Sequence, residues 1–207
     1  MCSLVFKSIL RFHDPYAKGN TITRTIRIDE GYDDILKHEA NRHGISVNQI
    51  MDQQIRRYVE TYRFFDKTNA ATLSASTLRA LMEGLDEETI MKISYELGKE
   101  RPHELMLRRG IQPTYETSLW YIQEVLGDHS GWFTAIISTR GEHENINLSH
   151  AYGYKWSLFL SGYLKELFEE VLEIKPEVTV LSSSTNFAFK VRDIEKKWGS
   201  IREQKDV

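Results

Sequence analysis

The sequence predicts an α+β fold in which a short β-α-α module precedes a larger domain built on an antiparallel sheet. Three observations predict it. Residues 21–28 are rich in β-branched side chains, and their isoleucines share one parity, which is typical of a strand. Residues 33–62 instead repeat apolar side chains at helical spacing. From residue 132 onward, two pairs of strand-like segments flank one strongly amphipathic helix.

The first module is expected to contain one strand and two helices. The strand at 21–28 is followed by Asp29, Glu30 and Gly31, a combination that breaks strands. A helix is predicted over 33–43, because Gly44 is a good C-terminal stop. A second helix is predicted from Ser46, a favourable N-cap, to about residue 62.

The second domain is expected to add a helical segment and then a ββαββ sheet. Short helices are predicted at 76–84, 86–98, 104–109 and 114–126, strands at 132–138, 145–150, 177–182 and 187–191, and the long amphipathic helix at 156–171. The expected boundaries are an N-terminal extension at 1–20, the β-α-α module at 21–63, a linker at 64–72, the sheet domain at 73–192 and a charged tail at 193–207.

Composition gives a modest hint about partners. The formal net charge is -3, which by itself argues against a coat of positive charge for nucleic acid. Residues 1–63 carry ten Lys and Arg against eight Asp and Glu, whereas the rest of the chain carries 17 against 22. A slightly basic module attached to an acidic one is therefore indicated.

The cysteine count and the apolar runs indicate a cytoplasmic protein. The single cysteine, Cys2, can form no internal disulfide and gives no metal cluster, so a reducing cytoplasm is the expected compartment. No apolar run approaches the roughly 18 residues that cross a bilayer, and we expect no membrane association.

The predicted strand at 21–28 needs a partner. A lone strand has two open edges, and two short helices cannot bury both its face and their own apolar stripes. A second copy would solve this, because two strands would pair antiparallel and four helices would close the core. We therefore expect a homodimer or a higher homo-oligomer. The alternative is an ordinary edge strand whose threonines reflect β-propensity alone.

The strand face that points away from such a core would carry Thr23, Thr25 and Arg27, together with Thr21. Small hydroxyls and a guanidinium suit the DNA major groove, which admits a two-stranded ribbon. The strand 23–28, Gly44 between the helices and the segment 46–51 resemble the ribbon-helix-helix family, which includes the MetJ and Arc repressors. The resemblance covers residues 21–62 and implies an intertwined dimer in which Thr23, Thr25 and Arg27 contact bases.

The resemblance also implies a phosphate contact at Ser46, Val47 and Asn48. Free backbone N–H groups at a helix N-terminus favour an anion independently of any family. Arg24 departs from the pattern, because the family usually has an apolar residue there. Either Arg24 reaches a phosphate from the rim, or the strand register is shifted by one residue and the two faces exchange.

The expected function is a sequence-specific transcriptional regulator that binds double-stranded DNA as a dimer or a dimer of dimers. The second domain would sense an unidentified small-molecule effector or strengthen assembly. One alternative is an antitoxin-type DNA-binding protein whose C-terminal domain binds a protein partner. Another alternative, from a different class, is a protein-interaction module without DNA binding, which the net negative charge favours.

The sequence of the second domain gives little support for catalysis or metal binding. We expect no enzyme and no cofactor, because there is no nucleophile elbow, no glycine-rich phosphate loop and no paired cysteine. His103, His129, His143 and His150 suggest a metal site only weakly, since no pair has the i, i+4 spacing of ligands on one helix face. We therefore expect no metal.

The aromatic residues of this half are expected to form core, with a ligand pocket or a dimer contact as the alternatives. The segment 147–157 resembles a segment that follows ribbon-helix-helix modules in archaeal proteins of unknown function.

Overall fold

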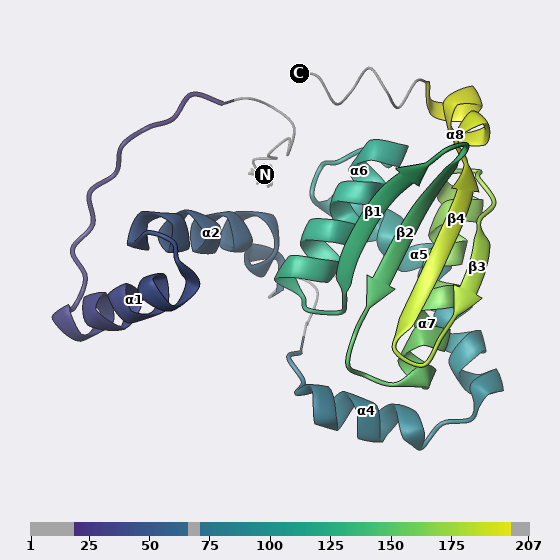
Figure 1. The fold of residues 1–207 in the computed structure, drawn as a ribbon, viewed down its shortest axis with the longest axis horizontal. Coiled ribbons are helices and arrows are strands. Elements are labelled where there is room, and N and C mark those ends of the chain that lie inside the picture. The colour runs from purple at the N-terminus through teal and green to yellow at the C-terminus, as the bar shows by residue number, and fades with distance from the viewer. Residues whose placement is uncertain (1–18, 66–70, 200–207) are drawn as a thin grey trace, which may run out of the picture. The chain divides into compact units, whose positions relative to one another are not determined.

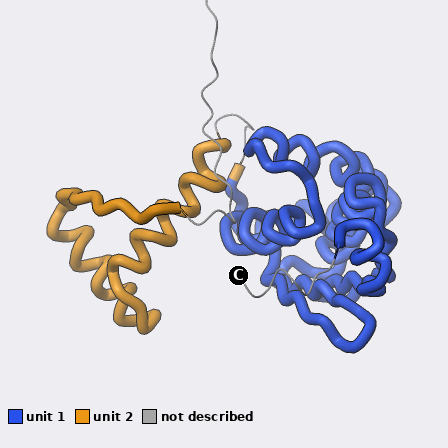
Figure 2. Tube along the Cα trace, turned by 90° about the horizontal axis from the view of Figure 1, so that it is seen from above, with its two compact units in different colours: residues 1–12, 72–207 blue, residues 13–71 orange. Residues whose placement is uncertain are grey.

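The computed structural model describes residues 19–65 and 71–199 (Figure 1). These residues fall into two compact units that meet in sequence between Ala71 and Thr72 (Figure 2). Each unit has its own arrangement of secondary structure, and each is described by itself. The predicted boundary between a first module and a sheet domain, with a linker at 64–72, stays a prediction.

The N-terminal unit is helical in its described part. It contains α1 (Glu30–His43), α2 (Val47–Glu60) and the short 3-10 helix η1 (Tyr62–Phe64). Residues 19–29 precede α1 and form no regular element. The predicted strand at 21–28 is therefore wrong, and with it the predicted β-α-α fold class of this module. Alternating β-branched residues favour an extended backbone, but a strand also needs a neighbouring strand to take its hydrogen bonds.

Local capping residues explain where the two helices begin and end. The Asp29 carboxylate accepts a hydrogen bond from the Gly31 N–H at 2.9 Å, so α1 begins three residues before the predicted position. Gly44 ends α1 with φ 65°, a left-handed conformation that glycine adopts without a Cβ clash. Ser46 caps α2 through a reciprocal capping box with Gln49.

The C-terminal unit contains the sheet. Its elements are α4 (Ala75–Glu83), α5 (Glu87–Arg108), α6 (Tyr115–Trp120), η2 (Tyr121–His129), β1 (Thr134–Arg140), β2 (His143–Ser149), α7 (Tyr154–Glu166), η3 (Leu167–Val171), β3 (Glu177–Val180), β4 (Ser184–Lys190) and α8 (Val191–Trp198). All strand pairs are antiparallel, and the strand order is β1-β2-β4-β3.

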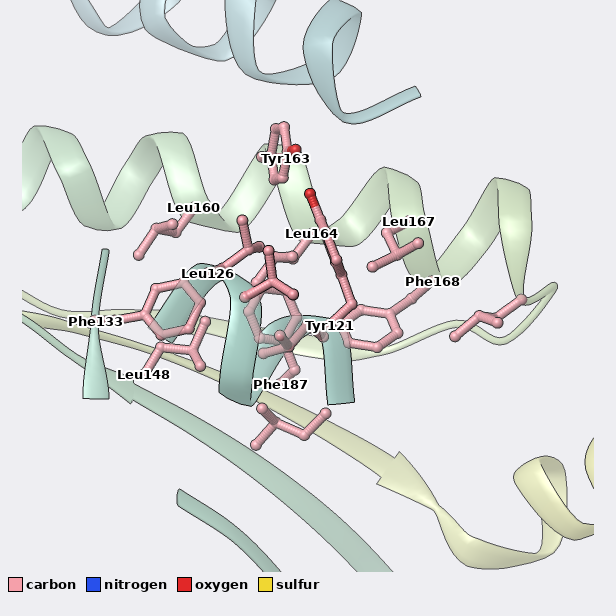
Figure 3. Packing of buried hydrophobic residues seen from close by; sticks show 14 of the residues in the cluster. Tyr121, Leu126, Phe133, Leu148, Leu160, Tyr163, Leu164, Leu167, Phe168 and Phe187 are labelled. Atoms are coloured by element: carbon pink, nitrogen blue, oxygen red, sulfur yellow. The ribbon is translucent and has the colours of Figure 1, made fainter. Parts of the chain in front are cut away.

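One face of this sheet carries the hydrophobic core. Ile137, Ile146, Phe187 and Val178 stand in register across the four strands and mark the centre of that face. Helices α5 and α7 lie behind the sheet in Figure 1. The aromatic and aliphatic side chains of α7, η2 and the strands interdigitate between them (Figure 3). The ββαββ order expected in the second domain is present among the described residues.

Helices α5 and α7 approach each other unusually closely. A Cβ atom added at Gly98 of α5 would lie 2.4 Å from the Tyr163 carbonyl oxygen of α7. A Cβ atom added at Gly162 of α7 would lie 2.0 Å from the Ser94 Oγ of α5. A side chain at Gly98 would force the helix backbones apart, and one at Gly162 would displace the Ser94 hydroxyl from its hydrogen bond to the Met91 carbonyl. Both positions are therefore fixed by packing and not by helix propensity.

Some of the predicted helices differ from the structure, and a helix lies where the start of a charged tail was predicted. The two helices predicted at 86–98 and 104–109 form the single helix α5, which continues through the buried Pro102. The helix predicted at 114–126 is an α-helix only as far as Trp120 and continues as the π-helix η2. Helix α8 packs back onto the unit, because Ile194 is buried and the Trp198 indole N–H donates to the Leu172 carbonyl at 3.0 Å.

Candidate interaction surface

Large apolar side chains stand exposed on the N-terminal unit. We call this set the N-terminal apolar surface; its members, with their exposed fractions, are Ile22 (72 %), Ile26 (60 %), Ile28 (43 %), Tyr32 (68 %), Ile35 (62 %), Ile55 (59 %) and Tyr58 (60 %). Single exposed apolar residues are ordinary on protein surfaces, but this many in about 40 residues are not.

The exposed side chains follow the helical repeat. Tyr32 and Ile35 are three residues apart on α1, and Ile55 and Tyr58 are three residues apart on α2. Residues at this spacing lie on one face of a helix, so each helix carries an apolar stripe. Ala40 is the only buried hydrophobic residue within α1 and α2. The contact between the two helices therefore leaves most of both stripes uncovered.

The charged side chains of α1 and α2 largely pair within their own helix. The Lys37 ammonium lies 2.5 Å from the Asp33 carboxylate, one helical turn away. The hydrogen bond to Asp33 raises the pKa of Lys37, which is fully exposed. Arg56 pairs in the same way with Asp52 at 3.4 Å. Such exposed pairs contribute little to stability, but they leave the apolar stripes as the distinguishing feature of the unit.

The residues predicted to contact DNA bases lie in the segment before α1. Thr23, Thr25 and Arg27 are all exposed there, as is Arg24, and the segment forms no strand. The two-stranded ribbon that would insert into the major groove is therefore absent from the described structure. This finding overturns the prediction that the chain is a sequence-specific DNA-binding regulator of transcription, because base reading was inferred from that ribbon.

The residues predicted to contact phosphate lie at the start of α2. Ser46 is the N-cap, and Val47 and Asn48 are the first two helical residues. The Ser46 hydroxyl accepts from the Gln49 N–H, and the Gln49 side chain accepts from the Ser46 N–H at 2.8 Å. The structure thus gives Ser46 the role of a cap. A contact with phosphate at these three residues stays a prediction.

In the C-terminal unit, one buried polar pair links the helices to the sheet. The Tyr115 hydroxyl at the start of α6 donates to the Glu144 carboxylate of β2 at 2.6 Å. Glu144 is only 2 % exposed. Burial, followed by the neighbouring Glu144, raises the pKa of Tyr115 well above its ordinary value, so the phenol keeps its proton. The sequence analysis missed this pair, because its members are 29 positions apart and neither belongs to a motif.

A second buried polar pair lies between helices. Tyr121, at the start of the π-helix η2, points its hydroxyl toward that of Tyr163 on α7 (Figure 3). Burial raises the pKa of both phenols, which therefore stay neutral. The Tyr121 hydroxyl makes no hydrogen bond of good geometry. The two hydroxyls face each other inside a packed core, which gives them a structural role.

The structure does not bring His143 and His150 together. His143 begins β2 and His150 follows its last residue, so the two lie at opposite ends of one strand. The His150 Nε2 lies 2.9 Å from the Ser157 hydroxyl oxygen.

The aromatic residues pack mainly on one another. The Trp156 ring stacks on Phe159 with centroids 4.9 Å apart, and Phe159 stacks on Tyr163 at 5.6 Å. Trp132 meets Trp156 edge-on at 5.3 Å, and the Trp156 indole N–H donates to the Trp132 carbonyl at 3.0 Å. This is the arrangement of a core, with each ring in a favourable pair geometry.

Comparisons with known proteins identify no family for this chain. No family model matches the chain, and no curated protein matches it. A search of solved structures finds a trafficking protein particle complex subunit 3 from Naegleria fowleri, in a structure where that protein is covalently bound to palmitic acid. The likeness covers 68 % of this chain and 96 % of that chain at 11 % identity, with a TM-score of 0.37.

This neighbour is a trafficking-complex subunit and not a ribbon-helix-helix protein, and at this TM-score we rest no argument on it. The resemblance to the ribbon-helix-helix family and that of 147–157 to an archaeal segment stay predictions. A search of the described residues finds no helix long and apolar enough to cross a membrane.

Proposed function

We propose that this chain is a protein-interaction module that assembles with further copies of itself through the N-terminal apolar surface. The observation that carries the proposal is the contrast between the four large apolar side chains that α1 and α2 expose and the single hydrophobic residue, Ala40, that they bury. Two isolated helices of 14 residues are marginally stable in water, so tertiary contacts must supply their stability.

Burial of the N-terminal apolar surface would contribute a substantial free energy to association. Fully burying one isoleucine side chain contributes roughly 1.5–3 kcal/mol. Ile35 and Ile55 each have about three-fifths of their surface in water, and Tyr32 and Tyr58 have similar fractions. Covering these four side chains on two copies would contribute on the order of 10 kcal/mol before the entropy cost of association. This contribution is comparable to the roughly 4–15 kcal/mol that association costs, so burial of the surface can offset that cost.

A second copy is the partner that fits most simply. Every copy carries the same stripes, so one two-fold axis lets each surface cover the other. The intrahelical ion pairs Lys37–Asp33 and Arg56–Asp52 already satisfy nearby charges, so an apolar contact need not break them. A partner of opposite net charge is not required.

The direct test is the mass of the chain in solution. Wild-type protein should sediment at twice 24.2 kDa or more. The double variant Ile55→Glu with Tyr58→Glu should sediment at 24.2 kDa, because two carboxylates would have to be desolvated in the interface. Near-ultraviolet circular dichroism of the tryptophans should be unchanged, because all four lie in the C-terminal unit.

A matched control adds the same charge elsewhere on α2. Gln49 and Gln53 are exposed and lie on the side of α2 opposite Ile55 and Tyr58, so Gln49→Glu with Gln53→Glu should keep the wild-type mass. A glutamate at position 49 can still form the capping box with Ser46. A wild-type chain that stays at 24.2 kDa at about 100 µM would overturn the proposal of self-assembly. Equal dissociation by both double variants would show that charge, and not the apolar surface, controls assembly.

A further inference from the structure

The connection between β2 and α7 is held by one histidine. The His150 N–H donates to the Ser183 carbonyl of the β3–β4 turn at 3.0 Å. Its ring Nε2 lies 2.9 Å from the Ser157 Oγ of α7, and its Nδ1 lies 3.3 Å from the Tyr152 backbone nitrogen. Three segments therefore meet at this residue.

These contacts specify a neutral imidazole. The Tyr152 N–H can only donate, so Nδ1 must accept and the ring proton must sit on Nε2. Nε2 then donates to the Ser157 hydroxyl, which is completely buried. The ring also stacks on that of Tyr152, with centroids 5.9 Å apart. A doubly protonated ring would present a donor to the Tyr152 N–H, and this contact would become repulsive.

The surroundings also disfavour a charge on the ring. Burial lowers the pKa of His150 to about 4. The charged groups near this connection are Arg79 and Glu83 of α4, which lie beside Gly153, and Lys155 of α7, which donates to the Leu85 carbonyl. Burial is the cause of the lowered pKa, and no neighbouring charge contributes to it. The facing β3–β4 turn, residues 181–183, carries no ionisable side chain.

We propose that His150 is an acid-operated latch, whose protonation releases the 150–153 connection and opens the aromatic cluster behind it. Tyr152 links the latch to that cluster, because its hydroxyl donates to the Gly131 carbonyl and its ring meets Trp156 at 5.7 Å. Gly131 directly precedes Trp132, the ring that packs edge-on against Trp156. Release of residues 150–153 therefore withdraws cover from both indoles.

The direction of the pH effect follows from the pKa. The closed form binds the proton at about pH 4 and the opened form at the ordinary value of 6.5. The closed form thus has its full stability above pH 6.5 and loses it as the pH falls toward 4. The ratio of opened to closed molecules should rise by up to tenfold for each pH unit across this window. Tenfold is an upper bound because the two forms differ by at most one bound proton at this residue.

The experiment compares acrylamide quenching of tryptophan fluorescence between pH 7.5 and 4.5 in the full chain. Wild-type quenching should rise steeply as the pH falls, and His150→Gln should remove most of that rise, since glutamine can still donate to Ser157 but does not titrate. The control His143→Gln changes an exposed histidine at the other end of β2 and should keep the wild-type profile. A His150→Gln profile that still matches wild type would overturn the proposal.

A second measurement does not depend on any variant folding. The imidazole proton resonances of wild-type protein, titrated by nuclear magnetic resonance, should show one histidine with a pKa well below 6.5, assigned through its contact with Tyr152. A pKa near 6.5 for His150 would overturn the latch, even if His150→Gln proved unstable.

Discussion

The two units of this chain differ in how far their apolar side chains are buried. In the N-terminal unit, helices α1 and α2 share the single buried hydrophobic residue Ala40 and expose isoleucines and tyrosines. In the C-terminal unit, side chains from helices and strands converge on one continuous core, where Leu160, Leu164 and Phe187 are completely buried. The C-terminal unit therefore has the hydrophobic core of an independently stable domain. Helices α1 and α2 have no such core of their own.

This difference predicts which substitutions should destabilise a single chain and which should weaken association. A substitution in the C-terminal core should act on a single chain, whatever the protein concentration. A substitution on the N-terminal apolar surface should act mainly through association, and so should depend on concentration. The predicted effects of substitutions in the two units follow from this difference, and the core substitutions should have the largest effects.

Phe187→Ala should cost roughly 3–5 kcal/mol of unfolding free energy, because it empties a fully buried site beside Phe168, whose ring centroid is 5.4 Å away. Urea unfolding followed by near-ultraviolet circular dichroism measures this loss. The matched substitution Tyr58→Ala, on the N-terminal apolar surface, should leave the urea concentration of this transition unchanged. It should instead lower the mass of the assembly in solution. If both variants shifted the transition equally, the two units would not be energetically distinct.

Tyr115→Phe should cost about 1–3 kcal/mol, because it leaves the buried Glu144 carboxylate without its hydroxyl donor. Urea unfolding again provides the measurement. The double variant Tyr115→Phe with Glu144→Leu should recover much of the loss, since both polar groups are then gone. Failure of that recovery would mean that the Tyr115 hydroxyl contributes by some route other than Glu144.

The same pair predicts an alkaline effect of definite sign. The pKa of Tyr115 is raised above its ordinary 10.0 in the folded chain, so above pH 10 the unfolded chain holds fewer protons than the folded one. Stability should therefore fall as the pH rises through 10, and Tyr115→Phe should reduce that fall.

Ser46→Ala should have the smallest effect, about 1 kcal/mol, because it removes the hydroxyl that caps α2. The loss should appear as faster amide hydrogen exchange in α2 and as weaker self-association. Ser74→Ala removes the matching cap of α4 in the C-terminal unit and should leave the exchange of α2 unchanged. Equal changes in α2 exchange in both variants would contradict the separation of the units.

The sheet was the most predictable part of the fold. Alternation in β2 and β4 places Ile146, Leu148 and Phe187 inward and polar residues outward, and each strand has a neighbour in the same chain. The segment 21–28 shows similar alternation but forms no strand, because alternation reports a preference for extended backbone and does not supply a hydrogen-bonding edge. The DNA-binding function failed with that strand.

The helices were predictable only where local signals decided them. Ser46 and Gly44 gave correct ends because caps act over a few residues. Separate helices were predicted at 86–98 and 104–109, yet α5 continues through Pro102, which tertiary packing buries. The Tyr115–Glu144 bond and the close approach of Gly98 to Tyr163 depend on residues far apart in sequence, which no local pattern records.

The approach of Gly98 to Tyr163 also limits how the C-terminal unit can move. If α7 slid along α5 by one residue, a side chain would have to occupy a space in which the Tyr163 carbonyl oxygen leaves no room for even a methyl group. Sliding of α7 along α5 is therefore sterically blocked. The two helices should therefore move together as one rigid body within the sheet domain.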